Sequence, residues 1–280
     1  MDRRCSGQNA RCWWTLTFPE IKACLKEEDP IIILPIGSCE QHGAHLPVGT
    51  DTMLSFYLAC AASAQCKYPT IVLPPLWVGY SPHHMGAPGT LTLSETTLIS
   101  VIYDICKSLI EHNANRILLL NGHGGNEPLL IIATNKIARR FGKSPIAVTY
   151  WKLIATEIGQ IRKSPRGGMG HACEFETSLA LYLFPELVKL TRAVTSLEPG
   201  DRYFSPDLFA TNIIHYYVDY LKLSSSGVIG DPLTASEEEG RQVFVLLIEK
   251  LCELIEDYGR GNLALLKHSG QKEGVKNEGC

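Results

Sequence analysis

The sequence lacks several signatures that would assign it to a common functional class. It contains no C-x-x-C pair, which argues against a structural zinc knuckle and a thioredoxin-type redox site. It has neither the G-x-G-x-x-G spacing of dinucleotide-binding loops nor the G-x-x-x-x-G-K-[ST] spacing of P-loops. It also lacks an excess of one charge, since 26 basic and 29 acidic side chains give a formal net charge of −3. The charge therefore gives no reason to expect a nucleic acid or a membrane as partner.

No targeting or membrane-spanning segment stands out either. Residues 1–12 are polar and have no apolar core of the kind found in secretory signals. The uncharged run at 52–66 is too short to cross a bilayer. The ten cysteines are spread from Cys5 to Cys280, several within apolar stretches, so they do not suggest a disulfide framework. We therefore expect a soluble, cytoplasmic protein with reduced cysteines.

Short apolar runs alternate with helical patterns along the chain. Four runs are typical of strands buried on both faces, at residues 30–36, 70–73, 116–120 and 145–150. Apolar residues at three- and four-residue steps predict helices after Ser94, over 129–141, around 178–184 and after Ser236. This alternation predicts an α/β fold with a mainly parallel sheet covered by helices on both faces. No linker divides the chain, so we expect a single domain over 1–267 and a flexible polar tail over 268–280.

The first group of chemically versatile residues directly follows the predicted strand at 30–36. Glu40, His42 and Asp51 lie within twelve residues of one another. In an extended chain Glu40 and His42 point to the same side, and the glycine and proline that follow allow a turn that brings Asp51 back. Carboxylate oxygen and imidazole nitrogen together suit zinc, manganese or iron(II). A polar loop with surface histidines is the alternative interpretation.

A glycine-rich loop at 121–126 follows the predicted strand at 116–120. Its glycines allow the backbone to approach a ligand closely, and His123 would point into the crevice at the end of the strand. A phosphate cradle before a helix and a plain turn are the alternatives.

The third group is His171, Glu174 and Glu176. In a helix, His171 and Glu174 share a face at i,i+3, whereas Glu176 points away unless the first turn is irregular. One glutamate can therefore face a site while the other has a structural role. The start of an amphipathic helix with solvated acids is the alternative.

The loop at 79–90 adds Ser81 and His84, which could contact a substrate. Each of the two is also compatible with an ordinary hydrogen-bonded loop position.

Together these stretches resemble the creatininase (creatinine amidohydrolase) family. The motifs that carry the resemblance occur in the expected order at 34–43, 79–90, 121–126, 171–178 and 227–232. The resemblance implies a three-layer α/β fold, a two-metal site and hydrolysis of an amide-type C–N bond in a small molecule. It also implies a homo-oligomer, for which a hexamer is one form. The substrate stays open, because the family includes a deformylase, a peptidase and an inosose-ring hydrolase.

The resemblance also implies a set of metal ligands. By position, one ion is held by Glu40, Asp51 and His123, and the other by His42 and Asp51, with Asp51 as the bridge. In creatininase itself a glutamate two places after the loop histidine completes the second site, and here that place is Gly125. This difference argues against creatinine as substrate and makes Glu174 the predicted substitute ligand, with Glu176 as the alternative. Zinc and manganese are the expected ions, and iron is also compatible.

The expected reaction is attack on a carbonyl carbon by a water that the metal pair activates. We expect His171 to pass a proton to the leaving nitrogen, with Glu176 orienting His171 or acting in its place. Backbone N–H groups of Gly124 and Gly125 would contact the oxyanion, and Ser81 would contact the substrate. Two alternatives come from other classes: a metal-free hydrolase with Cys39 as nucleophile, and a non-catalytic module that binds a phosphate or nucleotide.

Overall fold

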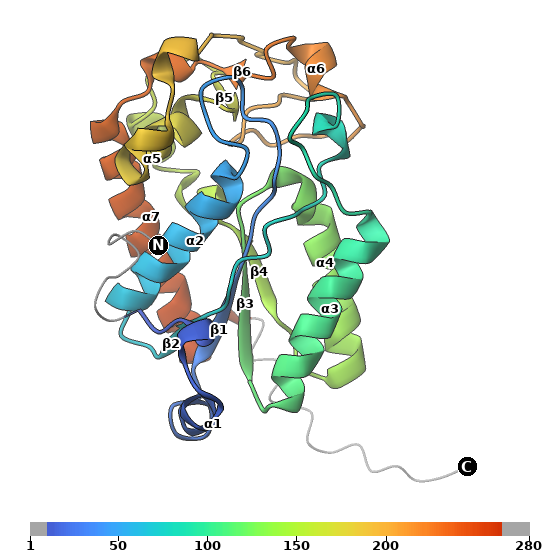
Figure 1. Cartoon of the computed structure of the whole chain (residues 1–280), viewed down its shortest axis with the longest axis vertical. Helices are drawn as coiled ribbons and strands as arrows, with labels where there is room; N and C mark the ends of the chain where they lie inside the picture. Colours follow the sequence, from blue (N-terminus) through green and yellow to red (C-terminus); the bar gives the residue numbers. More distant parts are fainter. Residues whose placement is uncertain (1–9, 265–280) are drawn as a thin grey trace.

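A four-stranded parallel sheet runs through the middle of the molecule in the computed structural model, which describes residues 10–264 (Figure 1). The strands are β1 (Ile31–Ile36), β2 (Thr70–Val72), β3 (Arg116–Asn121) and β4 (Ile146–Thr149). They pair in the order β2-β1-β3-β4, and every pair is parallel. The four strands predicted from apolar runs are confirmed.

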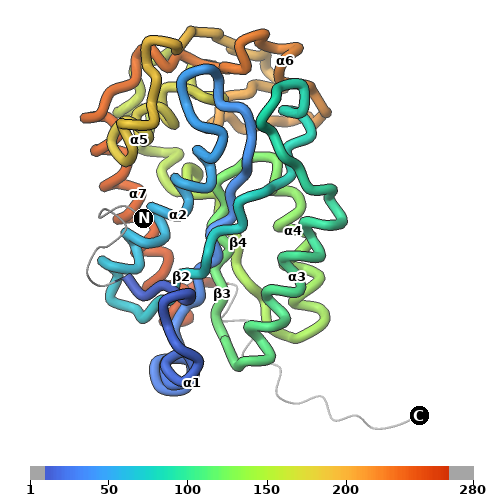
Figure 2. Tube along the Cα trace, viewed as in Figure 1, coloured from blue at the N-terminus to red at the C-terminus, as the bar shows by residue number. Residues whose placement is uncertain are grey.

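Helices cover both faces of this sheet and complete the three layers. On one face lie α3 (Glu95–Glu111) and α4 (Glu127–Phe141). On the other face lie α2 (Thr50–Gln65), α5 (Glu174–Leu183) and α7 (Glu237–Gly259), as the tube in Figure 2 also shows. The predicted α/β fold with covered faces is thereby confirmed. Among the described residues, no helix is both long and apolar enough to cross a membrane.

Strand β1 shows why the sheet needs both layers. Its side chains alternate between the two cores: Ile31 and Ile33 pack in the α2/α5/α7 core, and Ile32 and Leu34 pack in the α3/α4 core. A strand that is apolar at every position must be buried on both faces, and all six residues of β1 are buried.

The remaining elements lie outside these layers. Helix α1 (Phe18–Glu27) lies at one end of the molecule, near the start of β1. At the opposite end, β5 (Met169–His171) and β6 (Ile229–Gly230) form a small antiparallel pair near the short helix α6 (Tyr220–Leu223). The tail predicted at 268–280 lies outside the described residues.

Ser94 and Ser236 cap α3 and α7 as predicted, each accepting a backbone hydrogen bond from the residue three positions later. Helix α2 was not predicted, because after Asp51 in its first turn its sequence has no charged residue that would mark a polar face with a helical period.

Helices α5 and α7 approach closely at Gly240. A Cβ atom built on Gly240 would lie 1.8 Å from the carbonyl oxygen of Ser178 in α5. The close contact therefore depends on the absence of a side chain at this position.

We predict that Gly240→Ala lowers the free energy of unfolding by about 1–3 kcal/mol, because the two helices must move apart. At an exposed helical position the same change usually stabilises by up to about 1 kcal/mol. Urea denaturation of Gly240→Ala, with Gly159→Ala as control, measures the difference. A Cβ on Gly159 meets nothing within 4 Å. A Gly240→Ala protein as stable as the wild type would contradict the prediction.

Candidate metal centre

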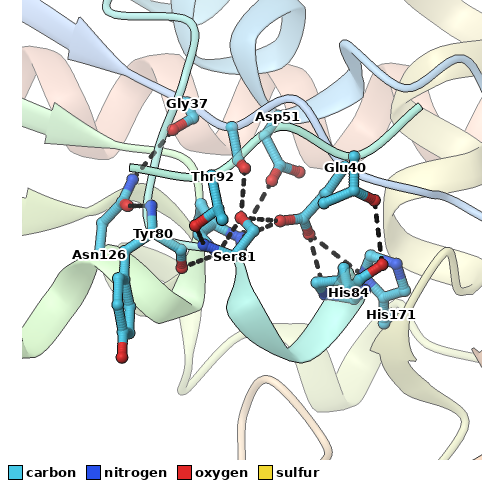
Figure 3. A network of polar contacts seen from close by, with 12 residues as sticks. Gly37, Glu40, Asp51, Tyr80, Ser81, His84, Thr92, Asn126 and His171 are labelled. Atoms are coloured by element: carbon cyan, nitrogen blue, oxygen red, sulfur yellow. Dashed lines mark hydrogen bonds and ion pairs between the residues drawn. The ribbon is translucent and has the colours of Figure 1, made fainter. Parts of the chain in front are cut away.

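The loops that follow β1, β2 and β3 meet the junction between β5 and α5 at one point of the molecule. Figure 3 shows Glu40, Asp51, Ser81, His84 and His171 pointing toward one another there. Members of the first three groups singled out in the sequence lie close together there, namely Glu40, His42, Asp51, His123, His171 and Glu176. This is the edge at which parallel α/β sheets bind ligands.

Asp51 reaches the site because the chain turns back after β1 and then forms α2. Gly43 has a φ of 61°, a left-handed conformation that glycine adopts without strain. Helix α2 begins at Thr50 and places Asp51 in its first turn. The expected return of Asp51 toward Glu40 is therefore achieved by the turn together with an unpredicted helix.

Glu40, Asp51 and His123 form one compact group of ligand atoms. Nδ1 of His123 lies 3.1 Å from Oε2 of Glu40 and 3.1 Å from Oδ2 of Asp51. All three side chains are buried. Two carboxylate oxygens and one imidazole nitrogen make a donor set that suits a divalent cation.

A second group consists of His42, Asp51 and Glu176. Nε2 of His42 lies 3.0 Å from Oδ1 of Asp51 and 3.9 Å from Oε1 of Glu176. Asp51 therefore belongs to both groups, with one oxygen facing each. A third grouping, of Glu40 and His42 with His171, overlaps the first two.

Two buried atoms of this cluster have a charged neighbour at about 3 Å but no hydrogen bond of acceptable geometry within residues 10–264: Nε2 of His42 and Oδ2 of Asp51. Buried polar atoms are normally paired, and an unpaired one needs a physical reason. Coordination of a cation would supply the missing interactions, so the residues present are compatible with metal ions at these two groups.

The buried carboxylates favour positive charge between them. Burial alone would lower the pKa of His42, but Asp51 and Glu176 outweigh it and hold that pKa well above its usual value. Burial also opposes charge on His123, yet Glu40 and Asp51 raise its pKa to about 10. Burial would raise the pKa of Asp51, but His42 and His123 hold it below its usual value. A bound cation would supply the same compensating charge.

Comparison with known proteins agrees with this arrangement. A family model described as "Creatininase: Creatinine amidohydrolase" matches residues 14–255, which is most of the chain. The chain belongs to the creatininase family. It is thus a member of a family of amidohydrolases.

Three curated relatives cover most of the chain. It is 28% identical to creatinine amidohydrolase of Pseudomonas putida over 257 residues, 86% of this chain and 95% of that protein. It is 31% identical to 3-dehydro-scyllo-inosose hydrolase of Thermotoga maritima over 264 residues, 87% of this chain and 82% of that protein. It is 29% identical to mycofactocin precursor peptide peptidase of Mycobacterium ulcerans, over 79% of this chain and 82% of that protein.

Solved creatininase structures share the fold. The manganese form superimposes with a TM-score of 0.78 at 25% identity and covers 89% of this chain and 98% of that one. A mutant described as the Zn-Zn type matches with the same values. Creatininase relatives have thus been solved in manganese and zinc forms.

Within this creatininase-family site the predicted role of Glu174 as a metal ligand needs correction. Oε1 of Glu174 accepts a hydrogen bond from the backbone N–H of Lys163 at 2.7 Å, and Oε2 accepts one from Ser164 at 2.9 Å. Both oxygens are thereby engaged by a neighbouring loop. Glu176, and not Glu174, belongs to the second group and is the candidate ligand there; its predicted part in proton transfer stays a prediction.

The error has a local cause. The prediction assumed that His171 and Glu174 share one helix, but His171 ends β5 and α5 begins only at Glu174. Ala172, between them, has a φ of 49°, so the chain changes direction before the helix starts. The i,i+3 argument therefore does not apply to this pair.

The three residues predicted to contact the substrate lie in different surroundings. Ser81 is fully buried and donates its hydroxyl hydrogen to Oε2 of Glu40 at 2.6 Å, so it supports Glu40 and does not face a substrate. Gly124 is exposed, and a Cβ there would meet nothing within 4 Å. At Gly125 a Cβ would lie 2.3 Å from the carbonyl oxygen of Tyr80, so the glutamate of creatininase has no room at this position.

The two alternatives from other classes lack support in the site. Burial and the nearby Glu40 raise the pKa of the Cys39 thiol, and a nucleophilic cysteine needs a low one. The glycine-rich loop faces the carboxylates of Glu40 and Asp51, which would repel a phosphate.

Some residues of the site had little or no sequence signal. His84 was expected only as a substrate contact, but it is fully buried with Nε2 3.2 Å from Oε1 of Glu40. The ring of His83 stacks on His123 with the centroids 5.5 Å apart. Tyr220, from α6, contacts the edge of His84. Two adjacent histidines in a loop after a buried strand were the available signal for the first two.

Glu174 and Glu176 provide a matched pair of variants within one helical turn. We predict that Glu176→Gln lowers bound metal from about two ions per chain to about one, since it removes a charged ligand. Glu174→Gln is expected to keep the metal and to destabilise the fold by about 1–3 kcal/mol, because its amide replaces one acceptor by a donor. Elemental analysis and urea denaturation measure the two effects. The opposite pattern would restore Glu174 as the ligand.

A second prediction concerns pH. The carboxylate of Glu239 is buried beside Glu174 and lies 3.2 Å from Nζ of Lys163. Burial, with Glu174 adding to it, raises the pKa of Glu239 from 4.5 to about 7. The folded state therefore holds a proton that the unfolded state releases, so this stabilising contribution is present below the unfolded pKa and is lost as pH rises to about 7.

Accordingly, the free energy of unfolding of the wild type should fall more steeply between about pH 4.5 and pH 7.5 than that of Glu239→Gln. Denaturant titrations at several pH values measure both slopes. Parallel curves would show that Glu239 does not titrate in this range.

Proposed function

We propose that the protein is a dinuclear metal-dependent hydrolase that cleaves a C–N bond in a small amide, either cyclic or a formamide. The observation that carries the proposal is the position of Asp51, whose two oxygens face two separate groups of ligands. In this proposal Glu40, Asp51 and His123 hold one ion, and His42, Asp51 and Glu176 hold the other.

Zinc and manganese are the proposed ions. The donor set of three carboxylates and two imidazoles supports either of them, and iron(II) is also compatible. Creatininase relatives solved in manganese and Zn-Zn forms support the same choice. When bound, two such ions polarise a carbonyl group and make a water molecule more acidic.

His171 is the proposed acid/base residue of the reaction. Its Nε2 donates to the carbonyl oxygen of Gln41 at 2.7 Å, which fixes the ring. Its Nδ1 faces the cluster, 3.7 Å from Oε1 of Glu40. A lone pair held in this position can take a proton and pass it to the leaving nitrogen. The ring is buried, which keeps bulk water from competing for that proton.

The glycine-rich loop is the proposed point of substrate entry. Gly124 is exposed and has open space beside its Cα atom, so a substrate carbonyl can approach its backbone. A backbone N–H in this position would stabilise negative charge on the carbonyl oxygen. Gly125 is crowded by Tyr80, so its backbone is less open to a substrate than that of Gly124.

Creatinine itself is an unfavourable choice of substrate. The glutamate that creatininase carries in this loop is Gly125 here, and the surrounding atoms leave no space for it. The curated relatives differ in what they act on, which supports a family site that serves several substrates. We therefore propose another cyclic amide or a formamide.

A homo-oligomer is also proposed. Tyr216 and Tyr217 are 56% and 65% exposed, which makes the segment before α6 a suitable place for contact between copies. Size-exclusion chromatography with light scattering tests this assembly. The cytoplasmic location expected from the sequence stays a prediction.

Removal of metal tests the proposed function most simply. After treatment with a chelator, hydrolysis of the best substrate from a panel of cyclic amides, formamides, cyclic ketones and short peptides should fall by more than about 100-fold. Addition of manganese or zinc should restore it. Full activity in a protein without detectable metal would contradict the proposal.

The Cys39→Ala variant is the matching control for the cysteine alternative. It should keep its metal and most of its activity, because the thiol has no role in the proposed reaction. Loss of activity with unchanged metal content would favour a cysteine nucleophile instead.

A further inference from the structure

Three buried histidines around Glu40 and Asp51 share one hydrogen-bonding pattern. Each places one ring nitrogen near a backbone carbonyl oxygen: His42 Nδ1 at 3.2 Å from Glu40, His123 Nε2 at 3.1 Å from Tyr80, and His171 Nε2 at 2.7 Å from Gln41. A carbonyl oxygen only accepts, so that nitrogen carries the hydrogen in each ring. In the neutral ring the other nitrogen then offers a lone pair to the centre, as in a metal ligand or a base.

In His84 the arrangement is reversed, because the nitrogen that faces the centre carries the hydrogen. The side-chain amide of Gln41 determines this arrangement. Oε1 of Gln41 accepts from the N–H of Gly43 at 2.9 Å, and Nε2 of Gln41 donates to the carbonyl oxygen of Gly227 at 3.1 Å. These two backbone groups have fixed polarity, so the amide can adopt only one orientation. Its remaining hydrogen points at Nδ1 of His84, 2.9 Å away.

Nδ1 of His84 must therefore accept, and the ring hydrogen of His84 lies on Nε2. This nitrogen is buried and has no aligned hydrogen-bond partner within the described part of the chain. Oε1 of Glu40 lies 3.2 Å from this nitrogen (Figure 3). The terminal torsion of a glutamate has a broad energy minimum, so a rotation of the carboxylate can bring the two groups into alignment.

The two oxygens of Glu40 are thus in different surroundings. Oε2 accepts from Ser81 and lies 3.1 Å from Nδ1 of His123, inside the first ligand group. Oε1 faces the hydrogen of His84. A donor on Oε1 would hold the carboxylate in one orientation and leave Oε2 for the metal.

We propose that His84 is a positioning residue of the metal centre, held by Gln41 so that its Nε2–H group orients Glu40. The inference rests on the proposed metal site and adds a residue that does not itself bind the ion. It also explains why residue 227 is a glycine. A Cβ at this position would lie 2.0 Å from Oε1 of Gln41 and displace the amide.

The first test determines directly which ring nitrogen of His84 carries the hydrogen. In protein labelled with 15N at histidine, long-range 1H–15N spectra distinguish a protonated from an unprotonated ring nitrogen. We expect Nε2 of His84 to be protonated, both without metal and with zinc bound, with the signals assigned by their loss in His84→Asn. A hydrogen on Nδ1, or a zinc-induced coordination shift at His84, would overturn the proposal.

The second test separates the two ring nitrogens with a pair of substitutions. Asparagine places a polar atom near the position of Nδ1 and removes the donor to Glu40, whereas glutamine reaches the position of Nε2 and can still donate. Competition with a fluorescent chelator should show zinc affinity at one site about 10–100-fold weaker in His84→Asn, with a smaller loss in His84→Gln. His112→Asn, at an exposed position, is the control.

Wild-type zinc affinity in His84→Asn would overturn the positioning role. If both variants fail to fold, the spectra of the wild type still decide, with the His84 signals assigned from through-space contacts to the ring of Tyr220, whose centroid lies 4.6 Å away. A wild type that binds no zinc, with the hydrogen of His84 found on Nε2, would refute the proposed function while leaving the orientation of the ring as described.

Discussion

The buried carboxylate of Asp51 is the constraint on which the candidate site depends. It is only 2% exposed and has an imidazole nitrogen about 3 Å from each oxygen, His42 on one side and His123 on the other. An isolated buried charge is strongly unfavourable, so its presence requires compensating positive charge at both oxygens. Glu40 and Glu176 add further negative charge to the same small volume. In the proposed function a pair of divalent cations supplies that compensation.

The fold holds these groups together through the parallel pairing of β1 and β3. Ile36 and Asn121 are register partners at the ends of the two strands, so the loops that carry Glu40 and His123 leave the sheet side by side. Asn126 then ties three segments together: its amide donates to the carbonyl oxygen of Gly37 and accepts from the N–H of Tyr80 (Figure 3). The carbonyl oxygen of Tyr80 in turn contacts His123. The site is thus supported by the ends of rigid strands and by backbone hydrogen bonds, which favours fixed ligand positions.

Much of the fold and of the candidate site could be predicted from the sequence. The prediction was wrong where the backbone departs from a regular helix or strand. An apolar run such as 30–36 is stable only when it is buried on both faces of a sheet, so the strands could be predicted from simple patterns. The edge of the sheet at which the site lies followed from the same strands. The approach of Glu40, His42, Asp51 and His123 followed from their positions after strands. The choice between Glu174 and Glu176 depended on where α5 begins, and the left-handed Ala172 that sets this start has no sequence signal. The role of Gln41 could not be predicted, since its partners Gly43, His84 and Gly227 lie up to 186 residues from it in the sequence.

The central claim is that two metal ions lie side by side and share Asp51. Electron paramagnetic resonance of the protein titrated with manganese(II) tests it most directly, because neighbouring manganese ions couple magnetically through a bridging ligand. At about two equivalents of manganese per chain, the account predicts the spectrum of a coupled pair. The six-line spectrum of isolated ions at every ratio would contradict it.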